Sequence, residues 1–163
     1  MGKKGREIVE QKISVDEVIS DLNKAYADEW LAHYQYWIAA HWMNGINADA
    51  ITSRLTTQSA DELLHAEKFA NRIIELDGQP VMEFSKLSEV GKCGYKAPPK
   101  NPNDLKGVIE DVLKAERCAI DYYNNMIQKY KDKDIVTYEL FRNILIDEVS
   151  DEDEWEDLLE YQS

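Results

Sequence analysis

Hydrophobic residues recur at spacings of three and four along four long stretches of the chain, which is the pattern of helices that bury one face. No stretch alternates apolar and polar residues as a half-buried strand would, so we predict an all-α protein. Ser14 and Glu17 have capping-box spacing at the start of the first stretch, and Gly78 and Pro80 follow the second. The predicted helices span about 14–44, 48–77 and 104–130, and then run from the 131–134 turn almost to the C-terminus.

The lengths of the connections predict the topology of these four helices. Short links join the first helix to the second and the third to the fourth, so each pair should form an antiparallel hairpin. The link 78–103 contains Pro98, Pro99 and Pro102 and has room for a crossover along the bundle, with a short helix around 82–90. We therefore predict a four-helix bundle that forms a single domain over residues 1–163, with a flexible tail at 1–12.

Each predicted helix places a carboxylate among the positions that should face the core. Several buried acids would repel one another and would each cost several kcal/mol to desolvate. No Lys or Arg occupies the central core-facing positions, so shared protons or bound cations remain as the compensation. A single acid at such a position more often means that the buried face of the helix has been assigned wrongly. Acids at matching heights on all four helices favour a metal site instead. The first three helices contribute one acid each and the fourth contributes two: Glu29, Glu62, Glu116, and the pair Glu148 and Asp151.

The pair Glu62 and His65 sharpens the prediction, because residues three apart lie on one helix face and can bind the same ion. Together with one glutamate on each neighbouring helix, this pair matches the dinuclear carboxylate pattern of ferritin-like bundles. Carboxylates with an imidazole suit iron, with Mn or Zn as possible substitutes. Tyr36 and Tyr123 each lie seven residues past a glutamate on the same face, where they could donate hydrogen bonds to the site, supply electrons, or simply pack in the core.

Composition and charge narrow the possible partners. The chain has 163 residues, 44% of them hydrophobic, and a net charge of -13. No apolar run is long enough for a membrane span or a signal peptide, so we expect a cytoplasmic protein without membrane contact. The negative charge argues against DNA binding in spite of the basic N-terminal residues Lys3, Lys4 and Arg6. Nine of the fourteen residues from 147 to 160 are acidic, which indicates a solvated face or, alternatively, a surface that attracts Fe(II).

From Ile13 to Leu159 the sequence resembles the Dps-like branch of the ferritins, also called thioferritins or miniferritins. The matching residues lie in the segments Asp28–Trp37, Asp61–Glu67, Lys92–Tyr95, Glu116–Ile120 and Asp147–Asp151. The resemblance implies an intra-subunit di-iron site of the bacterioferritin type with two iron ions per subunit. It also implies oxidation of Fe(II) by hydrogen peroxide or dioxygen and storage of Fe(III) in a homo-oligomeric shell of twelve subunits. We expect the smaller shell because the chain stops shortly after the fourth helix.

Transferred to this sequence, the resemblance has Glu62 and Glu148 bridge the two irons, Glu29 and His65 complete the first, and Glu116 serve the second.

One position departs from the family, since Asp151 stands where a histidine is expected. Four alternatives follow: Asp151 ligates the second iron directly, acts through water, or leaves that iron weakly held, or Glu152 takes its place if the fourth helix is rotated slightly. His33, one turn after Glu29, is an alternative nitrogen ligand, whereas His41 is expected at the surface or an interface.

Cys93 and Cys118 are too few for a secreted disulfide framework. Cys118 is two residues from Glu116 on the predicted helix, which points it away from the site and argues against direct metal binding. From the residues alone, two unrelated thiols are the simpler interpretation. The resemblance implies instead that they meet near the iron site as a redox pair.

Two other function classes fit the same pattern. One is a di-metal peroxidase without storage, related to rubrerythrin or manganese catalase, although the Cys-x-x-Cys iron domain usual in rubrerythrins is absent from this sequence. The other is a non-catalytic metal-binding bundle whose second metal position has degraded at Asp151. Three observations distinguish these classes. Retained iron indicates storage, peroxide consumption without retained iron indicates the peroxidase, and metal content without turnover indicates the non-catalytic bundle.

Overall fold

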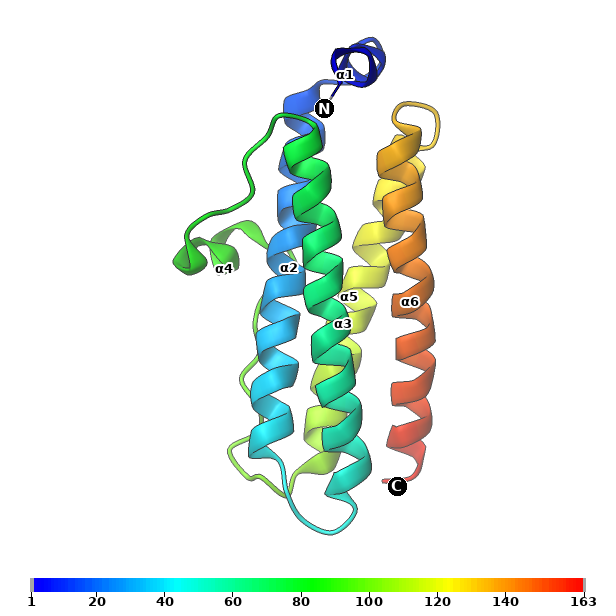
Figure 1. Ribbon diagram of the computed structural model, residues 1–163. Coiled ribbons are helices and arrows are strands. Elements are labelled where there is room, and N and C mark those ends of the chain that lie inside the picture. The colour runs from blue at the N-terminus through cyan, green and yellow to red at the C-terminus, as the bar shows by residue number, and fades with distance from the viewer. Residues whose placement is uncertain (1, 163) are drawn as a thin grey trace.

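Four long helices form an elongated bundle in the computed structural model, which describes residues 2–162 (Figure 1). Helix α2 (Val15–Trp42) and helix α3 (Ala48–Glu75) form one antiparallel hairpin, and α5 (Leu105–Tyr130) and α6 (Ile135–Glu160) form the other. The described residues contain helices and no strands. The all-α class and the two hairpins predicted from the sequence are confirmed.

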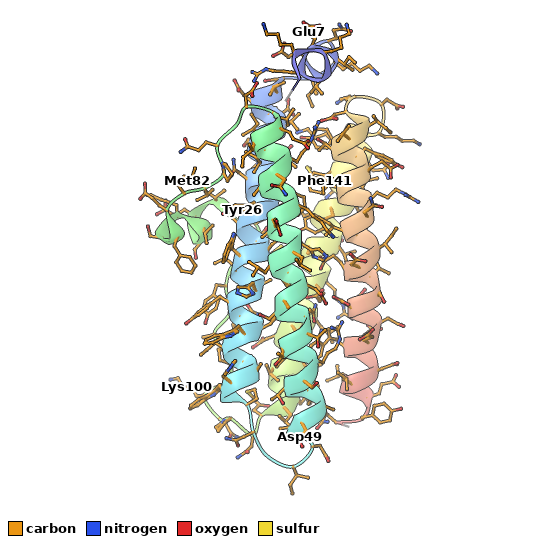
Figure 2. All side chains as sticks on the ribbon, in the orientation of Figure 1. Glu7, Tyr26, Asp49, Met82, Lys100 and Phe141 are labelled. Carbon is orange, nitrogen blue, oxygen red and sulfur yellow. A yellow bond between two sulfur atoms is a disulfide. The ribbon has the colours of Figure 1, made fainter. Side chains whose placement is uncertain are left out.

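The long connection between the hairpins runs along the outside of α2 (Figure 1). It contains the 3-10 turn η1 (Phe84–Lys86) and the short helix α4 (Leu87–Val90), close to the short helix expected at 82–90. Met82 extends from this connection away from the bundle (Figure 2) and is 71% exposed. The crossover returns the chain to the opposite end of the bundle, so that α5 runs parallel to α3.

The N-terminal segment contains a helix that the sequence pattern does not predict. Within the range 2–12, which is the described part of the expected tail, α1 (Lys3–Glu10) lies across one end of the bundle (Figure 1). Arg6 donates a hydrogen bond of 2.8 Å to the carbonyl of Leu76, and Lys12 donates one of 3.0 Å to the carbonyl of Asp132. These contacts with distant carbonyls hold the segment in place, and local sequence periodicity does not reveal them.

The helix ends use side chains from the connecting turns. Asp104 caps α5 by accepting a hydrogen bond from the amide of Gly107, and Asp134 caps α6 in the same way. Ser14 occupies the N-cap position of α2, but its side chain makes no capping hydrogen bond, so the predicted capping box is not formed. Asp134 also accepts two hydrogen bonds from the buried Arg72 of α3, at 3.0 and 2.9 Å. This pair ties the two hairpins together at one end.

Two large apolar clusters fill the bundle core with a polar layer between them, and a smaller third cluster contains Leu31 of α2 and Leu87 of α4. One large cluster, near the α1 end, contains Leu22, Phe69 and Phe141. The other, toward the C-terminus of α6, contains Ile51 and Trp155. Within the described chain, no helix is both long and apolar enough to cross a membrane. The polar layer between the clusters holds the candidate site.

Candidate metal centre

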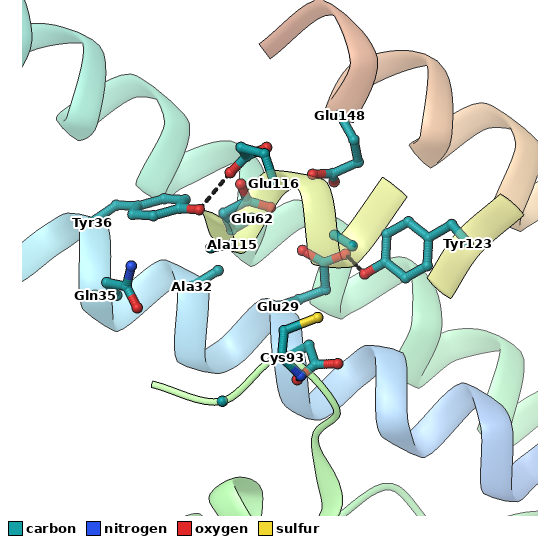
Figure 3. Close-up of a pocket in the computed structure, with 13 residues that line it drawn as sticks. Glu29, Ala32, Gln35, Tyr36, Glu62, Cys93, Ala115, Glu116, Tyr123 and Glu148 are labelled. Atoms are coloured by element: carbon teal, nitrogen blue, oxygen red, sulfur yellow. Dashed lines mark hydrogen bonds between the residues drawn. The ribbon is translucent and has the colours of Figure 1, made fainter. Parts of the chain in front are cut away.

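Four glutamates and one histidine meet in this polar layer, one glutamate from each long helix. Their side chains point toward one another in the middle of the bundle, as the glutamates in Figure 3 show. All are at most 3% exposed. The group comprises Glu29, Glu62, His65, Glu116 and Glu148. The sequence placed these residues on core-facing positions, and the structure brings them together.

His65 is the centre of the first of two candidate positions for a cation. Its Nδ1 atom lies 3.2 Å from Glu62 Oε2, 3.2 Å from Glu148 Oε1 and 3.7 Å from Glu29 Oε2. One ligand atom from each of these four residues lies within 4.8 Å of the others. The imidazole therefore stands beside three carboxylates with one nitrogen directed at them.

The second candidate position shares one residue with the first. Oxygen atoms of Glu62, Glu116 and Asp151 lie within 4.8 Å of one another. Glu62 belongs to both groups, so its carboxylate stands between them and is suited to a bridging role. The family resemblance implies a histidine at residue 151. The aspartate found there lies close enough to Glu62 and Glu116 to belong to the second group.

Two tyrosines hold the glutamates from inside the core. Tyr36 donates a hydrogen bond to Glu116 Oε1 and Tyr123 donates one to Glu29 Oε1 (Figure 3). Both rings are 1% exposed, so they pack in the core and donate to the site at once. Of the alternatives left open by the sequence, packing and hydrogen bonding therefore both apply.

Two buried carboxylate oxygens, Glu116 Oε2 and Glu148 Oε1, receive no well-oriented hydrogen bond, although His65 Nδ1 lies 3.2 Å from Glu148 Oε1. Buried polar atoms without a well-oriented partner are costly. A cavity of about 20 Å³ lies beside them, lined also by Glu29 and Glu62, which is room for about one water-sized particle. A cation between these oxygens would supply the missing partner.

The ionisation of the site follows from its burial. Burial and the neighbouring carboxylates raise the pKa of Glu29 and Glu116 well above the usual range, and burial with the charge of Glu62 raises the pKa of Glu148 to about 7. Burial also acts to raise the pKa of Glu62, but hydrogen bonds from His65 and Glu29 outweigh it and leave that pKa lowered. Burial disfavours charge on His65, yet its three glutamate neighbours raise its pKa overall. The isolated cluster thus holds protons that a metal ion would displace.

Asp151 has a partner that the sequence reasoning did not anticipate. Arg54 of α3 places Nη2 at 2.5 Å from Asp151 Oδ1. Arg54 also places Nε at 2.6 Å from Glu154 Oε2. The sequence predicts no compensation by a lysine or arginine, because neither type occupies a central core-facing position. Arg54 lies one residue before the core-facing Leu55, and its length lets it reach α6.

The alternative ligands considered from the sequence lie elsewhere. His33 directs Nδ1 at the carbonyl of Ser59, 2.7 Å away, and does not belong to either candidate group. His41 is exposed, as expected. Glu152 is paired with Arg117 at 2.6 Å and does not replace Asp151 at the cluster.

The two cysteines are joined by a disulfide with a Cα–Cα distance of 5.7 Å. Cys93 lines the same cavity as the glutamates (Figure 3), so the disulfide lies beside the site. The interpretation of two unrelated thiols is therefore wrong. Asp28 fixes the crossover here by accepting hydrogen bonds of 2.9 Å from the amides of Lys92 and Cys93. A Cβ at Gly91 would lie 2.5 Å from the same carboxylate, which explains a glycine at this position.

Sequence reasoning missed three polar residues around the centre. Asp28 is one, and Gln58 is another, since it donates a hydrogen bond of 3.3 Å to Glu62. The third is Asp147, which contacts Nε2 of His65 at 3.3 Å and so leaves Nδ1 directed at the carboxylates. Gln58 lies on the core-facing positions, which was the available signal for it. Neither aspartate carried a signal of that kind.

The donor set is chemically selective. Carboxylate oxygens with a single imidazole suit hard divalent ions such as Fe(II) and Mn(II) more than the nitrogen- and sulfur-rich sites that Zn prefers. Each of the two groups, which share Glu62, has ligand atoms close enough together to hold a metal ion.

Comparisons with known proteins identify a matching family and similar sequences. A ferritin-like domain matches residues 19–162. The DNA protection during starvation protein of Pyrococcus furiosus is 29% identical over 160 residues, covering 98% of this chain and 86% of that protein. The bacterioferritin of Desulfovibrio desulfuricans is 29% identical over 133 residues, covering 81% of this chain and 68% of that protein.

Two solved structures are similar to this chain over most of its length. A dodecameric thioferritin, the bacterioferritin-related protein of Bacteroides fragilis, superposes with a TM-score of 0.92 at 32% identity and covers 97% of this chain and 93% of its own. Dps from Thermosynechococcus elongatus superposes with a TM-score of 0.82 at 16% identity, covering 88% and 90%, which is a likeness of fold.

Proposed function

The chain belongs to the ferritin-like family, and on that premise we propose that it oxidises Fe(II) at the buried carboxylate cluster and stores the Fe(III) in a shell of twelve subunits. The observation that carries the proposal is the meeting of Glu29, Glu62, His65, Glu116 and Glu148 in one buried layer. Burying these acids together is costly, and divalent substrate ions offset that cost.

Each residue has a definite part in the proposed reaction. Glu29, His65, Glu62 and Glu148 bind the first Fe(II), and Glu62 with Glu116 binds the second, with Asp151 beside it. Glu62 bridges the two ions, and Glu148 is the second proposed bridge. Tyr36 and Tyr123 keep their glutamates oriented by hydrogen bonding.

The reaction takes one electron from each of two iron ions. With hydrogen peroxide as oxidant, two Fe(II) and H₂O₂ with two protons give two Fe(III) and two water molecules. Placing both ions on one shared carboxylate lets a single oxidant receive both electrons without release of a radical. The anionic oxygens stabilise the more highly charged ferric product.

The assembly and partners of this chain are also part of the proposal. The Bacteroides fragilis relative is a dodecamer, and its close superposition supports the same shell here. The name of the Pyrococcus furiosus relative refers to DNA protection. We propose that this chain protects by consuming Fe(II) and oxidant and does not coat DNA, because a net charge of -13 opposes binding to phosphates.

The test is oxidation of Fe(II) by the assembled protein with stoichiometric hydrogen peroxide, and separately with dioxygen, followed by size exclusion with iron analysis. We expect oxidation faster than in buffer and hundreds of irons eluting with the shell. Glu62→Gln should abolish the fast oxidation, and Glu67→Gln, a matched change at an exposed site on the same helix, should not. Oxidation no faster than buffer, or undiminished in Glu62→Gln, would contradict the proposal. Peroxide consumption without retained iron would indicate the peroxidase class instead.

A further inference from the structure

The two candidate positions differ in their electrostatic surroundings. No lysine or arginine in the described chain forms an ion pair with the residues around His65. At the other position, the guanidinium of Arg54 is in direct contact with Asp151. One positive charge therefore competes with any cation that approaches this side.

Arg54 is held where it is by three neighbours on α6. It contacts Asp151 at 2.5 Å and Glu154 at 2.6 Å, and its guanidinium carbon lies 5.9 Å from the ring centroid of Trp155. Asp151 and Arg54 side chains are only 14% and 15% exposed, whereas Glu154 is 56% exposed. Little water screens the Arg54–Asp151 contact, while Glu154 offers the guanidinium a second partner on the solvent side.

The same tryptophan connects Arg54 to the shared glutamate. Trp155 is fully buried and donates a hydrogen bond from Nε1 to Gln58, and Gln58 donates to Glu62. Arg54 thus belongs to a contiguous set of side chains that ends at the bridging carboxylate.

We infer that Arg54 sets the affinity of the second position, neutralising Asp151 so that the group of Glu62, Glu116 and Asp151 binds its cation weakly and exchanges it. This inference rests on the proposed function of the same site. When a divalent ion binds there, the guanidinium leaves Asp151 and stays with Glu154. The first position keeps its ion, and the second passes ions on, as transfer of product to a mineral store requires.

The experiment is a calorimetric titration of the assembled, metal-depleted protein with Co(II) under nitrogen at pH 7. The parent should show a tight first equivalent per subunit and a weaker second one. Arg54→Met, which keeps the aliphatic stem and removes the charge, should tighten the second step on the order of tenfold or more and leave the first within about twofold. Arg54→Lys should retain the weak second step.

Two further variants connect the effect to Asp151. Arg142→Met removes the same charge from a half-exposed arginine paired with Glu139 and should change neither step. Adding Asp151→Asn to Arg54→Met should remove the gain, because the freed carboxylate is what the second ion uses. An unchanged second step in Arg54→Met, or a gain that persists without the Asp151 carboxylate, would overturn the inference.

A surface variant keeps the test decisive if the Arg54 variants fail to assemble. Glu154→Gln changes an exposed side chain and deprives Arg54 of its alternative partner, so the second step should weaken by about two- to threefold. No weakening would count against the inference. Failure of the proposed function has a different signature, namely no first equivalent in the parent, or a first equivalent that Glu62→Gln leaves intact.

Discussion

Replacing Glu148 by Gln should flatten the pH dependence of unfolding of the metal-depleted protein. Glu148 is 2% exposed, and burial together with the charge of Glu62 raises its pKa from 4.5 to about 7. A carboxyl with a higher pKa in the folded state holds its proton more tightly there than in the unfolded chain. Its stabilising contribution is complete below about pH 4.5 and is lost as the pH rises through about 7.

The size of the effect follows from the same numbers. Each pH unit between the unfolded and folded pKa corresponds to about 1.4 kcal/mol, so ionisation of Glu148 removes roughly 3 kcal/mol of stability between pH 5 and 8. The raised pKa values of Glu29, Glu116 and His65 act in the same direction over this range. The parent should therefore lose more than roughly 3 kcal/mol, and Glu148→Gln should lose about 3 kcal/mol less than the parent.

The assay is urea unfolding followed by circular dichroism after chelator treatment, at pH 5, 6, 7 and 8 and at one protein concentration, because subunit association adds to apparent stability. Glu67→Gln is the matched control on the exposed surface and should behave like the parent. Saturating Co(II) should restore the stability of the parent at pH 8. Equal pH dependence in the parent and Glu148→Gln, or a parent that gains stability with rising pH, would refute the reasoning.

Three other substitutions should act through named contacts, each measured by urea unfolding at pH 7. Arg72→Met leaves the buried carboxylate of Asp134 unpaired and should cost about 3–5 kcal/mol; a loss below about 1 kcal/mol would contradict this. Cys118→Ser opens a loop of 25 residues and should cost about 2–4 kcal/mol, a difference that should vanish when the parent is also reduced. Tyr123→Phe removes the donor to Glu29 and should cost about 1–3 kcal/mol, with Tyr161→Phe at an exposed site as the neutral control.

Helical periodicity accounts for what the sequence could predict. The spacing of three and four residues fixes which side chains share a face, so Glu29, Glu116 and Glu148 could be placed in the core before any contact was known. The short connections predicted the two helical hairpins, and packing of the hairpins places the core-facing sides of the four helices against one another. The rule works because each of these residues is positioned by its own helix.

The residues that escaped prediction are positioned by partners far away in the sequence. Arg54 lies off the core-facing positions, and its direction is decided by Asp151, 97 residues later. Asp28 also lies off the core-facing positions of its helix. Its partners are backbone amides in an irregular loop, which has no periodic sequence pattern. Helix α1 takes its place from the contact between Arg6 and a backbone carbonyl 70 residues away. Long flexible side chains and irregular loops carry no repeating pattern from which such contacts could be inferred.

The ion pair between Arg72 and Asp134 helps to fix how the helices are aligned along the bundle axis. A helix that slips by one turn moves its side chains by about 5.4 Å along the axis, which exceeds the 4.8 Å span within which the ligand atoms of each group lie. Asp134 is fixed to the first turn of α6 by its capping hydrogen bonds, and Arg72 lies seven residues beyond His65 on α3. A slip of one hairpin against the other would break this pair before the glutamates could settle into a shifted arrangement. The register of four helices at the metal layer is thus maintained from the end of the bundle, by residues that never touch the metal.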